Sequence, residues 1–306
     1  MNNCGVLNID KPPGLTSREI VNHVVRLVRP AKVGHAGTLD PLATGVLVVC
    51  VGHATRLVSL AQEGRKRYLA RFLLGKTSDT DDSTGNVSDG GDCSRLTADD
   101  VTRFFPEFTG RISQVPPQFS AVHVNGERAY DLARRGETVE ISARSIDVHS
   151  IRLTQFQLPE IELDIECGSG TYVRSIGRDL GVRLGCGAIM TQLRRLAVGP
   201  FAAEDAVAMD FLTTKTIRAS LQPALKIVPH LPQRTLSSEE TTAVRRGQPI
   251  RLGIPSSTWV EQGDGHLDKK PAPLRVALVG KDDSLIGIGE IDLATDRLHP
   301  RIVFPN

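Results

Sequence analysis

The stretch from Val33 to Leu47 combines residue types and spacing that are suited to chemistry. It reads Val-Gly-His-Ala-Gly-Thr-Leu-Asp-Pro-Leu-Ala-Thr-Gly-Val-Leu, and its only acid is Asp40. Proline after Asp40 disfavours the α region for that residue, and the glycines allow the loop to lie close to another molecule. A carboxylate on such a loop can attack or orient a substrate. Asp-Pro and Thr-Gly also mark ordinary turns, so spacing alone leaves both interpretations open.

Regular elements flank this loop and must hold it in place. Residues 5–10 alternate like a short strand and end at a Lys-Pro-Pro-Gly turn. Thr16 or Ser17 can cap a helix whose apolar residues recur every 3.6 positions up to Arg29. The apolar run at 45–51 predicts a buried strand directly after the loop.

A tyrosine lies beside three cations in Arg65-Lys66-Arg67-Tyr68, at the start of a strand-like alternation. Proteins hold unpaired nucleotides by combining aromatic stacking with positive charge. Tyr68 could therefore stack on a base while the cations contact phosphates. The alternative is a tyrosine at a strand edge with solvated neighbours, which the residues alone favour.

The second half of the chain predicts a strand, a helix and a small β-rich module. Residues 161–167 alternate between apolar and polar, and a helix carrying Arg174 in its first turn follows. By spacing alone, Arg174 is an ordinary exposed arginine. Recurrent prolines near 221–232 indicate a domain boundary, which predicts domains at 1–230 and 231–306. The second contains a capped helix after Ser237 and a hairpin over 274–292.

Composition narrows the possible environments and partners. Residues 1–75 hold ten Lys/Arg against four Asp/Glu, whereas 76–110 hold three against eight, so a basic region precedes an acidic one. A basic region suits an anionic substrate. The five cysteines are scattered without metal-ligand spacing, which indicates reduced thiols. No signal sequence is recognisable and the apolar run at 46–51 is too short to cross a bilayer, so we expect a cytoplasmic protein.

The string from Gly34 to Gly45 closely resembles the catalytic motif of the bacterial tRNA pseudouridine synthase B (TruB) family. The resemblance extends over residues 5–199 and more weakly to the C-terminus. Strands and helices without βαβ regularity indicate an α+β fold, which agrees with the pseudouridine synthase fold that the resemblance implies. That fold has a central mixed or antiparallel sheet and an inserted, thumb-like RNA-binding loop, expected here at about 111–150. Residues 245–249 resemble the PUA RNA-binding domain, which implies a PUA-like C-terminal domain.

The resemblance also implies roles for individual residues. Asp40 is the expected nucleophile, and Arg174 is expected to pair with it and to lower its pKa. Tyr68 is expected to pack on the target base and to help remove the proton from C5. The other residues expected in the substrate pocket are His35, Tyr172 and Leu193. The residues expected to bind RNA are Lys11, Arg128, Arg134 and Arg135.

The activity implied by the resemblance is conversion of uridine to pseudouridine at position 55 in the T loop of tRNA. We expect the T stem-loop as partner, no guide RNA, no membrane, a monomer, and neither a metal nor an organic cofactor. Asp40 attacks either C6 of the base or C1′ of the ribose, and both routes stay open. Two residues depart from the family pattern: Phe119 replaces the commoner tyrosine and His123 the commoner lysine.

Two other classes of function remain as alternatives. The chain could be an RNA-binding or tRNA-folding protein in which isomerisation is secondary. It could also be a glycosidase-like hydrolase with Asp40 as nucleophile. Such a hydrolase needs a second carboxylate as acid, and no other acid has a comparable setting of glycines.

Overall fold

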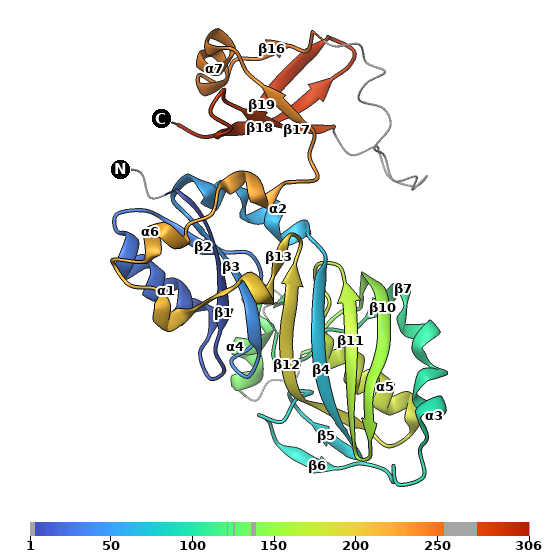
Figure 1. Cartoon of the computed structure of the whole chain (residues 1–306). Helices are drawn as coiled ribbons and strands as arrows, with labels where there is room; N and C mark the ends of the chain where they lie inside the picture. Colours follow the sequence, from blue (N-terminus) through green and yellow to red (C-terminus); the bar gives the residue numbers. More distant parts are fainter. Residues whose placement is uncertain (1–3, 121, 125, 136–138, 254–273, 306) are drawn as a thin grey trace.

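The computed structural model describes residues 4–120, 122–124, 126–135, 139–253 and 274–305. It has a large and a small β-sheet with helices packed on them, as the α+β prediction required (Figure 1). The large sheet is mixed, because β14–β1 and β12–β3 are parallel pairs and the others are antiparallel. Its strand order is β14 (Val207–Ala208), β1 (Gly5–Lys11), β3 (Thr44–Val51), β12 (Ala188–Val198), β4 (Lys66–Leu74), β11 (Glu160–Cys167), β10 (Arg144–Gln157) and β7 (Gly110–Gln114), with β2 (Val33–His35) on β3 and β13 (Phe201–Ala202) on β12.

Helices and short turns connect these strands. The α-helices are α1 (Ser17–Val28), α2 (Val58–Glu63), α3 (Ala98–Thr102), α4 (Ala129–Arg134), α5 (Val173–Leu184), α6 (Ile217–Ser220) and α7 (Ser238–Arg245). The 3₁₀ turns are η1 (Gly52–Leu57), η2 (Phe105–Phe108), η3 (Ala203–Asp205), η4 (Met209–Phe211) and η5 (Ala224–Ile227). Two small hairpins are β5 (Lys76–Ser78) with β6 (Val87–Asp89), and β8 (His123–Val124) with β9 (Glu127–Arg128).

Helix α1 begins where its capping residues predict. The Thr16 side chain accepts a hydrogen bond from the backbone N–H of Glu19, and the Glu19 carboxylate accepts one from the backbone of Thr16. The helix buries Ile20 and Val24 in a cluster with Leu47. This contact places α1 against β3, the strand that follows the Asp40 loop.

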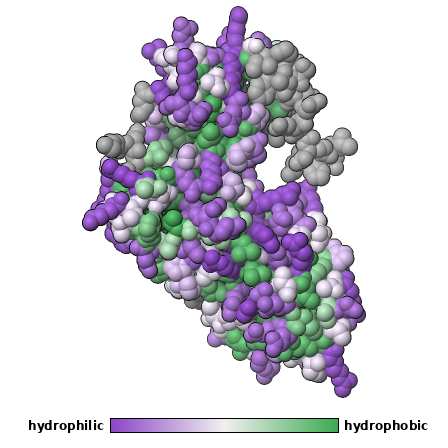
Figure 2. Space-filling model, viewed as in Figure 1, coloured by the Kyte–Doolittle hydropathy of each residue, from purple (hydrophilic) through white to green (hydrophobic). Residues whose placement is uncertain are grey.

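The side chains of strand β4 (Lys66–Leu74) alternate between the two faces of the large sheet. Tyr68 and Phe72 point into the core, where Phe72 meets α5. Arg67 and Arg71 point to the other face, where they pair with carboxylates of β11. Figure 2 shows hydrophilic residues among hydrophobic ones across the molecule in this view, as expected for a solvated surface.

Gly177 allows α5 to lie directly against Phe72. A Cβ atom at position 177 would lie 2.1 Å from the Phe72 ring. We therefore expect Gly177→Ala to push α5 away from β4 and to lower the free energy of unfolding by about 1–3 kcal/mol. Urea denaturation measures this loss. The matched control is Val182→Ala, because Val182 on the same helix is 69% exposed and its truncation should change stability by less than about 0.5 kcal/mol.

The expected inserted loop lies between two neighbouring strands of the large sheet. Strands β7 and β10 pair with each other, and the chain between them forms β8, β9 and α4. The insertion is therefore anchored at both ends in the sheet. The prediction of about 111–150 included most of β7 and the first half of β10, which belong to the sheet itself.

The small sheet follows the proline-rich stretch. Its order is β15 (Gln233–Thr235), β17 (Arg275–Val279), β18 (Leu285–Asp292), β19 (Arg297–Val303) and β16 (Ile250–Arg251). In Figure 1 it lies beyond the α2 end of the large sheet. Apolar residues join the two parts: Ala277, Leu285, Ile288 and Phe304 belong to one buried cluster with residues such as Leu57 and Val198.

Candidate active site

The loop that carries Asp40 is held by hydrogen bonds on both sides of the acid. Leu39 donates its N–H to the Ser17 hydroxyl at 2.8 Å, and this hydroxyl donates to the Leu39 carbonyl at 3.1 Å. The Pro41 carbonyl accepts from the N–H of Gly14 at 2.8 Å and from the Lys11 ammonium at 3.2 Å. These contacts fix the backbone of the acid before any substrate binds.

Gly45 brings the end of the loop against β12. Its φ of +95° is in the region that favours glycine, and a Cβ there would lie 2.2 Å from the Arg195 carbonyl. Strands β3 and β12 pair in parallel at this point. Gly45 thus allows the backbone at the end of the Asp40 loop to lie directly against the backbone of β12, the strand that carries Leu193.

Asp40 and Arg174 form an ion pair at one end of the pocket that both residues line. The Nε atom of Arg174 lies 3.0 Å from Oδ2 of Asp40. The arginine side chain is only 5% exposed, whereas 33% of the Asp40 side chain is exposed. The acid is therefore held at one oxygen and still open to a ligand.

Arg174 has further partners, which hold it independently of Asp40. It donates to the carbonyls of Thr80 at 2.7 Å and Phe119 at 3.1 Å. Its guanidinium also lies 3.4 Å from the buried carboxylate of Asp82. Asp82 in turn accepts hydrogen bonds from Thr80 and from Thr84. One guanidinium thus joins the Asp40 loop, the segment after β5 and the start of the insertion.

The pKa of Asp40 differs from the expected direction. Desolvation raises this pKa above the usual aspartate value, and the negative charge of Asp82 contributes to the rise. Arg174 and, more weakly, Lys11 lower it, but they do not reverse the shift. The expectation that Arg174 would bring the pKa below normal is therefore wrong in its net direction, because one arginine serves two carboxylates in a largely desolvated place.

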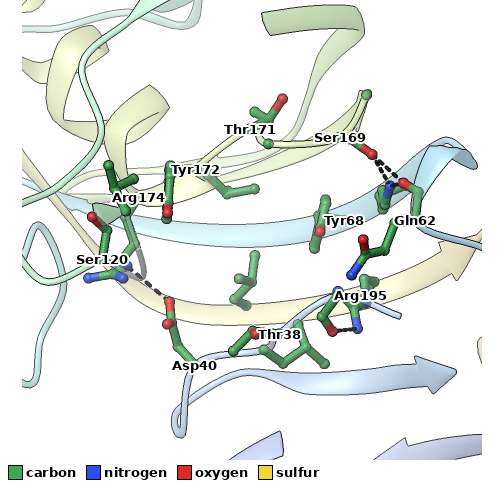
Figure 3. Close-up of a pocket in the computed structure, with 18 of the residues that line it drawn as sticks. Thr38, Asp40, Gln62, Tyr68, Ser120, Ser169, Thr171, Tyr172, Arg174 and Arg195 are labelled. Atoms are coloured by element: carbon green, nitrogen blue, oxygen red, sulfur yellow. Dashed lines mark hydrogen bonds and ion pairs between the residues drawn. The ribbon is translucent and has the colours of Figure 1, made fainter. Parts of the chain in front are cut away.

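The pocket beside Asp40 has a volume of about 750 Å³. Figure 3 shows Asp40 and Arg174 at one end, and Tyr68, Gln62 and Arg195 toward the other. The apolar side chain of Leu193 and the start of α5 complete the walls. A pocket of this size, with a carboxylate at one end and an aromatic ring in its wall, has room for a single nucleotide unit.

Tyr68 lies in the pocket wall, and its hydroxyl is a poor base. It lines the pocket although it is only 8% exposed. Burial raises its pKa above the usual tyrosine value, and the nearby charge of Arg195 opposes the rise without cancelling it. A phenol with a raised pKa is almost wholly protonated at neutral pH, so the expected role in removing a proton from C5 has little physical support.

We therefore expect Tyr68→Phe to keep its turnover rate within about tenfold of the wild-type rate, since the ring remains. Tyr68→Ala removes the stacking surface and should lower the rate by about 100-fold. Single-turnover assays on an RNA substrate compare the two variants. A Tyr68→Phe protein as slow as Tyr68→Ala would assign an essential role to the hydroxyl.

Tyr172 is held in the pocket wall by two other residues. Its backbone exchanges two hydrogen bonds with the side chain of Gln114, at 2.9 and 3.0 Å. The guanidinium of Arg144 lies 4.9 Å from the centre of its ring and donates to the carbonyl of Gly170. Among the expected substrate-binding residues, Tyr68, Tyr172 and Leu193 therefore meet in one pocket.

Two expected site residues lie elsewhere. His35 is in β2, outside the residues that line the pocket, and desolvation lowers its pKa. Lys11 is completely buried, and its ammonium donates to the carbonyls of Pro12 and Pro41. Lys11 thus holds the Asp40 loop, and the expectation that it contacts RNA phosphates does not fit this buried position.

The arginines expected to bind RNA lie in the insertion. Arg135 is exposed and pairs with Glu127 at 2.8 Å. The side chains of Arg128 and Arg134 lie outside the described part of the structure, as does that of His123. The contacts of these arginines with RNA stay predictions.

Sequence reasoning missed Asp82 and Arg195, and it expected Lys66 only as one of the cations that could contact phosphates. Asp82 lies in an Asp-rich segment that resembles a surface turn, and its pairing with Arg174 has no local signal. Lys66 and Arg195 line the pocket although they are almost fully buried. Alternation predicted the strand of Lys66, and in that strand its side chain falls on the same face as Tyr68, so the inward direction of Lys66 could have been found.

The described residues contain no cluster of three or more His, Cys, Asp or Glu suited to a metal ion. Within the same residues, no helix is long and apolar enough to span a membrane.

Comparisons with known proteins agree with this fold. The chain aligns with the solved Cbf5–Nop10–Gar1 complex at a TM-score of 0.72 and 26% identity, covering 98% of this chain and 85% of the other. The model of the TruB family pseudouridylate synthase N-terminal domain matches residues 25–173, which contain the Asp40 loop. That of the tRNA pseudouridylate synthase B C-terminal domain matches residues 174–228. The fold and the acid-bearing pocket therefore define a pseudouridylate synthase.

Curated relatives narrow this class to one family. A tRNA pseudouridine synthase B from Geobacter sulfurreducens is 40% identical, covering 96% of this chain and 98% of its own length. That from Dehalococcoides mccartyi is 43% identical, covering 81% of this chain and 84% of its own length. The chain belongs to the TruB family.

Proposed function

We propose that this chain converts uridine to pseudouridine in tRNA, at position 55 of the T loop, with Asp40 as nucleophile. The position of Asp40 supports this proposal: one oxygen pairs with Arg174, and a third of the side chain is open to a pocket of nucleotide size. A base inside a folded RNA loop must leave its stack to reach such a pocket. Tyr68 and Leu193 then supply a ring face and an apolar contact for it.

The reaction exchanges one bond between base and ribose for another. The N1–C1′ bond breaks, the base turns, and C5 bonds to C1′ while C5 loses its proton and N1 gains one. Asp40 assists by adding to C6 of the ring or by attacking C1′ of the ribose. Both routes use the same ionised oxygen and are compatible with the geometry.

The rest of the chain has matching proposed roles. Residues 1–230 form the catalytic domain, and the insertion anchored by β7 and β10 closes on the T stem-loop through Arg128, Arg134 and Arg135. Residues 231–306 act as a PUA-like RNA-binding domain. The enzyme works as a monomer in the cytoplasm and needs no guide RNA, because it binds the folded stem-loop directly.

The experiment uses the purified chain and an unmodified tRNA transcript. Mapping of pseudouridine should give product at position 55, and a transcript with cytidine at this position should give none. Release of free uracil would indicate a hydrolase instead. Refolding of a misfolded tRNA without any pseudouridine would indicate an RNA-folding protein.

A further inference from the structure

Two almost fully buried cations lie in the pocket wall away from Arg174. Lys66 is 6% exposed and Arg195 is 1% exposed. The Nε of Arg195 donates to the Val46 carbonyl at 2.7 Å, and its Nη2 donates to the Gly37 carbonyl at 3.1 Å. Lys66 donates to the Ser169 hydroxyl at 2.8 Å and to the Gln62 carbonyl. All these partners are neutral, so both positive charges are held in fixed positions without being neutralised.

Neither cation has an acidic partner in the part of the chain that the structure describes. The ion pairs formed there by neighbouring cations, such as Arg194 with Asp10, do not involve Lys66 or Arg195. Burial of an unpaired charge costs several kcal/mol even after relaxation. A site that retains two such charges is therefore prepared for negative charge that arrives with a ligand or develops during a reaction.

Because both cations are buried, the negative charge that they meet is one that develops during a reaction rather than that of an RNA phosphate. A phosphate stays at the rim, where it contacts exposed cations with free N–H groups. Arg195 instead borders the pocket beside Tyr68, at the end away from Asp40 (Figure 3). Lys66 lines the same pocket and donates to Ser169. This is where a base stacked on Tyr68 would have its ring.

We propose that Arg195 and Lys66 stabilise the negative charge that the uracil ring acquires during isomerisation. This inference rests on the proposed function. When the N1–C1′ bond breaks toward the base, its electron pair stays on the ring and spreads over N1 and the two carbonyl oxygens. When Asp40 instead adds to C6, the displaced electron pair moves toward C5 and O4. Both routes thus place negative charge on the base until a proton is exchanged, and fixed cations lower the energy of that state.

The test compares single-turnover rates and tRNA dissociation constants in the full chain. Lys66→Met and Arg195→Met should lower the rate by about 100-fold each and change tRNA affinity by less than about threefold. Arg195→Lys keeps the charge, so its rate should be at least about tenfold higher than that of Arg195→Met. The matched control is Arg194→Met. Arg194 directly precedes Arg195 on β12, pairs with Asp10 at 2.9 Å and does not line the pocket. Its rate should stay within about threefold of wild type.

A pH profile separates the effect of charge from a structural role. Burial, reinforced by the charge of Arg195, lowers the pKa of Lys66 to about 8. The ammonium loses its charge as the pH rises through this value, so kcat/KM should fall on the alkaline side. Lys66→Arg carries a permanent charge and should move that fall to higher pH.

The outcomes separate the two proposals. If the wild type makes pseudouridine and Lys66→Met works at the same rate, or if Lys66→Arg keeps the alkaline fall unchanged, the charge-stabilising role is overturned and the proposed function stands. If the wild type converts no uridine in tRNA, the proposed function fails and the inference fails with it. Slow but tightly binding Lys66→Met and Arg195→Met proteins, with a shifted profile for Lys66→Arg, support it.

Discussion

Replacement of Asp40 by asparagine should lower the single-turnover rate of pseudouridine formation by about 10⁴-fold or more. The amide keeps the shape of the side chain but has no ionised oxygen to add to the base or the ribose. The loop itself should not move, because its backbone is held at Leu39 and Pro41 by Ser17, Gly14 and Lys11. Single-turnover assays with labelled tRNA measure this effect directly.

The same variant should keep its affinity for tRNA and its stability. The folded protein raises the pKa of Asp40, so this residue favours folding only when protonated, and that contribution is lost as the pH rises through the raised pKa. Above that raised pKa the ionised acid therefore costs stability, and Asp40→Asn should there melt at the wild-type temperature or above it. A variant whose tRNA binding falls in step with its activity would contradict the role of nucleophile.

Arg174→Met is the second change with a large expected effect. Removal of this guanidinium leaves the Asp82 side chain, which is 4% exposed, without this cation and removes the hydrogen bonds that Arg174 donates to the carbonyls of Thr80 and Phe119. Breaking a buried pair in this way should cost about 3–5 kcal/mol of unfolding free energy. The rate should also fall by at least about 100-fold, because Asp40 loses the group that orients it.

Urea denaturation and single-turnover assays measure both effects of Arg174→Met. Arg183→Met is the control, since Arg183 lies on the same helix but pairs with Glu107 at the surface, where both side chains are about half exposed. Such a surface pair contributes about 0–1 kcal/mol. An Arg174→Met protein as stable as Arg183→Met would show that Asp82 finds another partner.

Local patterns predicted the elements that position the site. Alternation over 161–167 gave strand β11, and the cap at Thr16 gave helix α1, because these signals depend only on neighbours in sequence. The pairing of Arg174 with Asp40 joins residues far apart in the chain. Spacing could not predict it, and it came from the resemblance to a known family.

The predictions for His35 and Lys11 do not fit the described pocket, and they share a physical reason. A motif names residues near a site but does not say which way each side chain points from a loop. His35 and Lys11 lie near the Asp40 loop, yet neither lines the pocket, and the Lys11 side chain supports the Pro41 backbone. Asp82 was missed because it lies in a polar turn far from the Asp40 loop in sequence. Its carboxylate meets Arg174 only when α5 packs beside that turn.

The buried cluster shared by the two sheets limits how the protein can be divided. Ala277, Leu285, Ile288 and Phe304 pack with residues of the large-sheet part, including Leu57 and Val198. A fragment that ended near residue 230 would leave this apolar surface in water and should be prone to aggregation. Heat should therefore melt both sheets in a single calorimetric transition. For the same reason, weaker RNA binding by a truncated chain would report lost folding as much as a lost RNA contact.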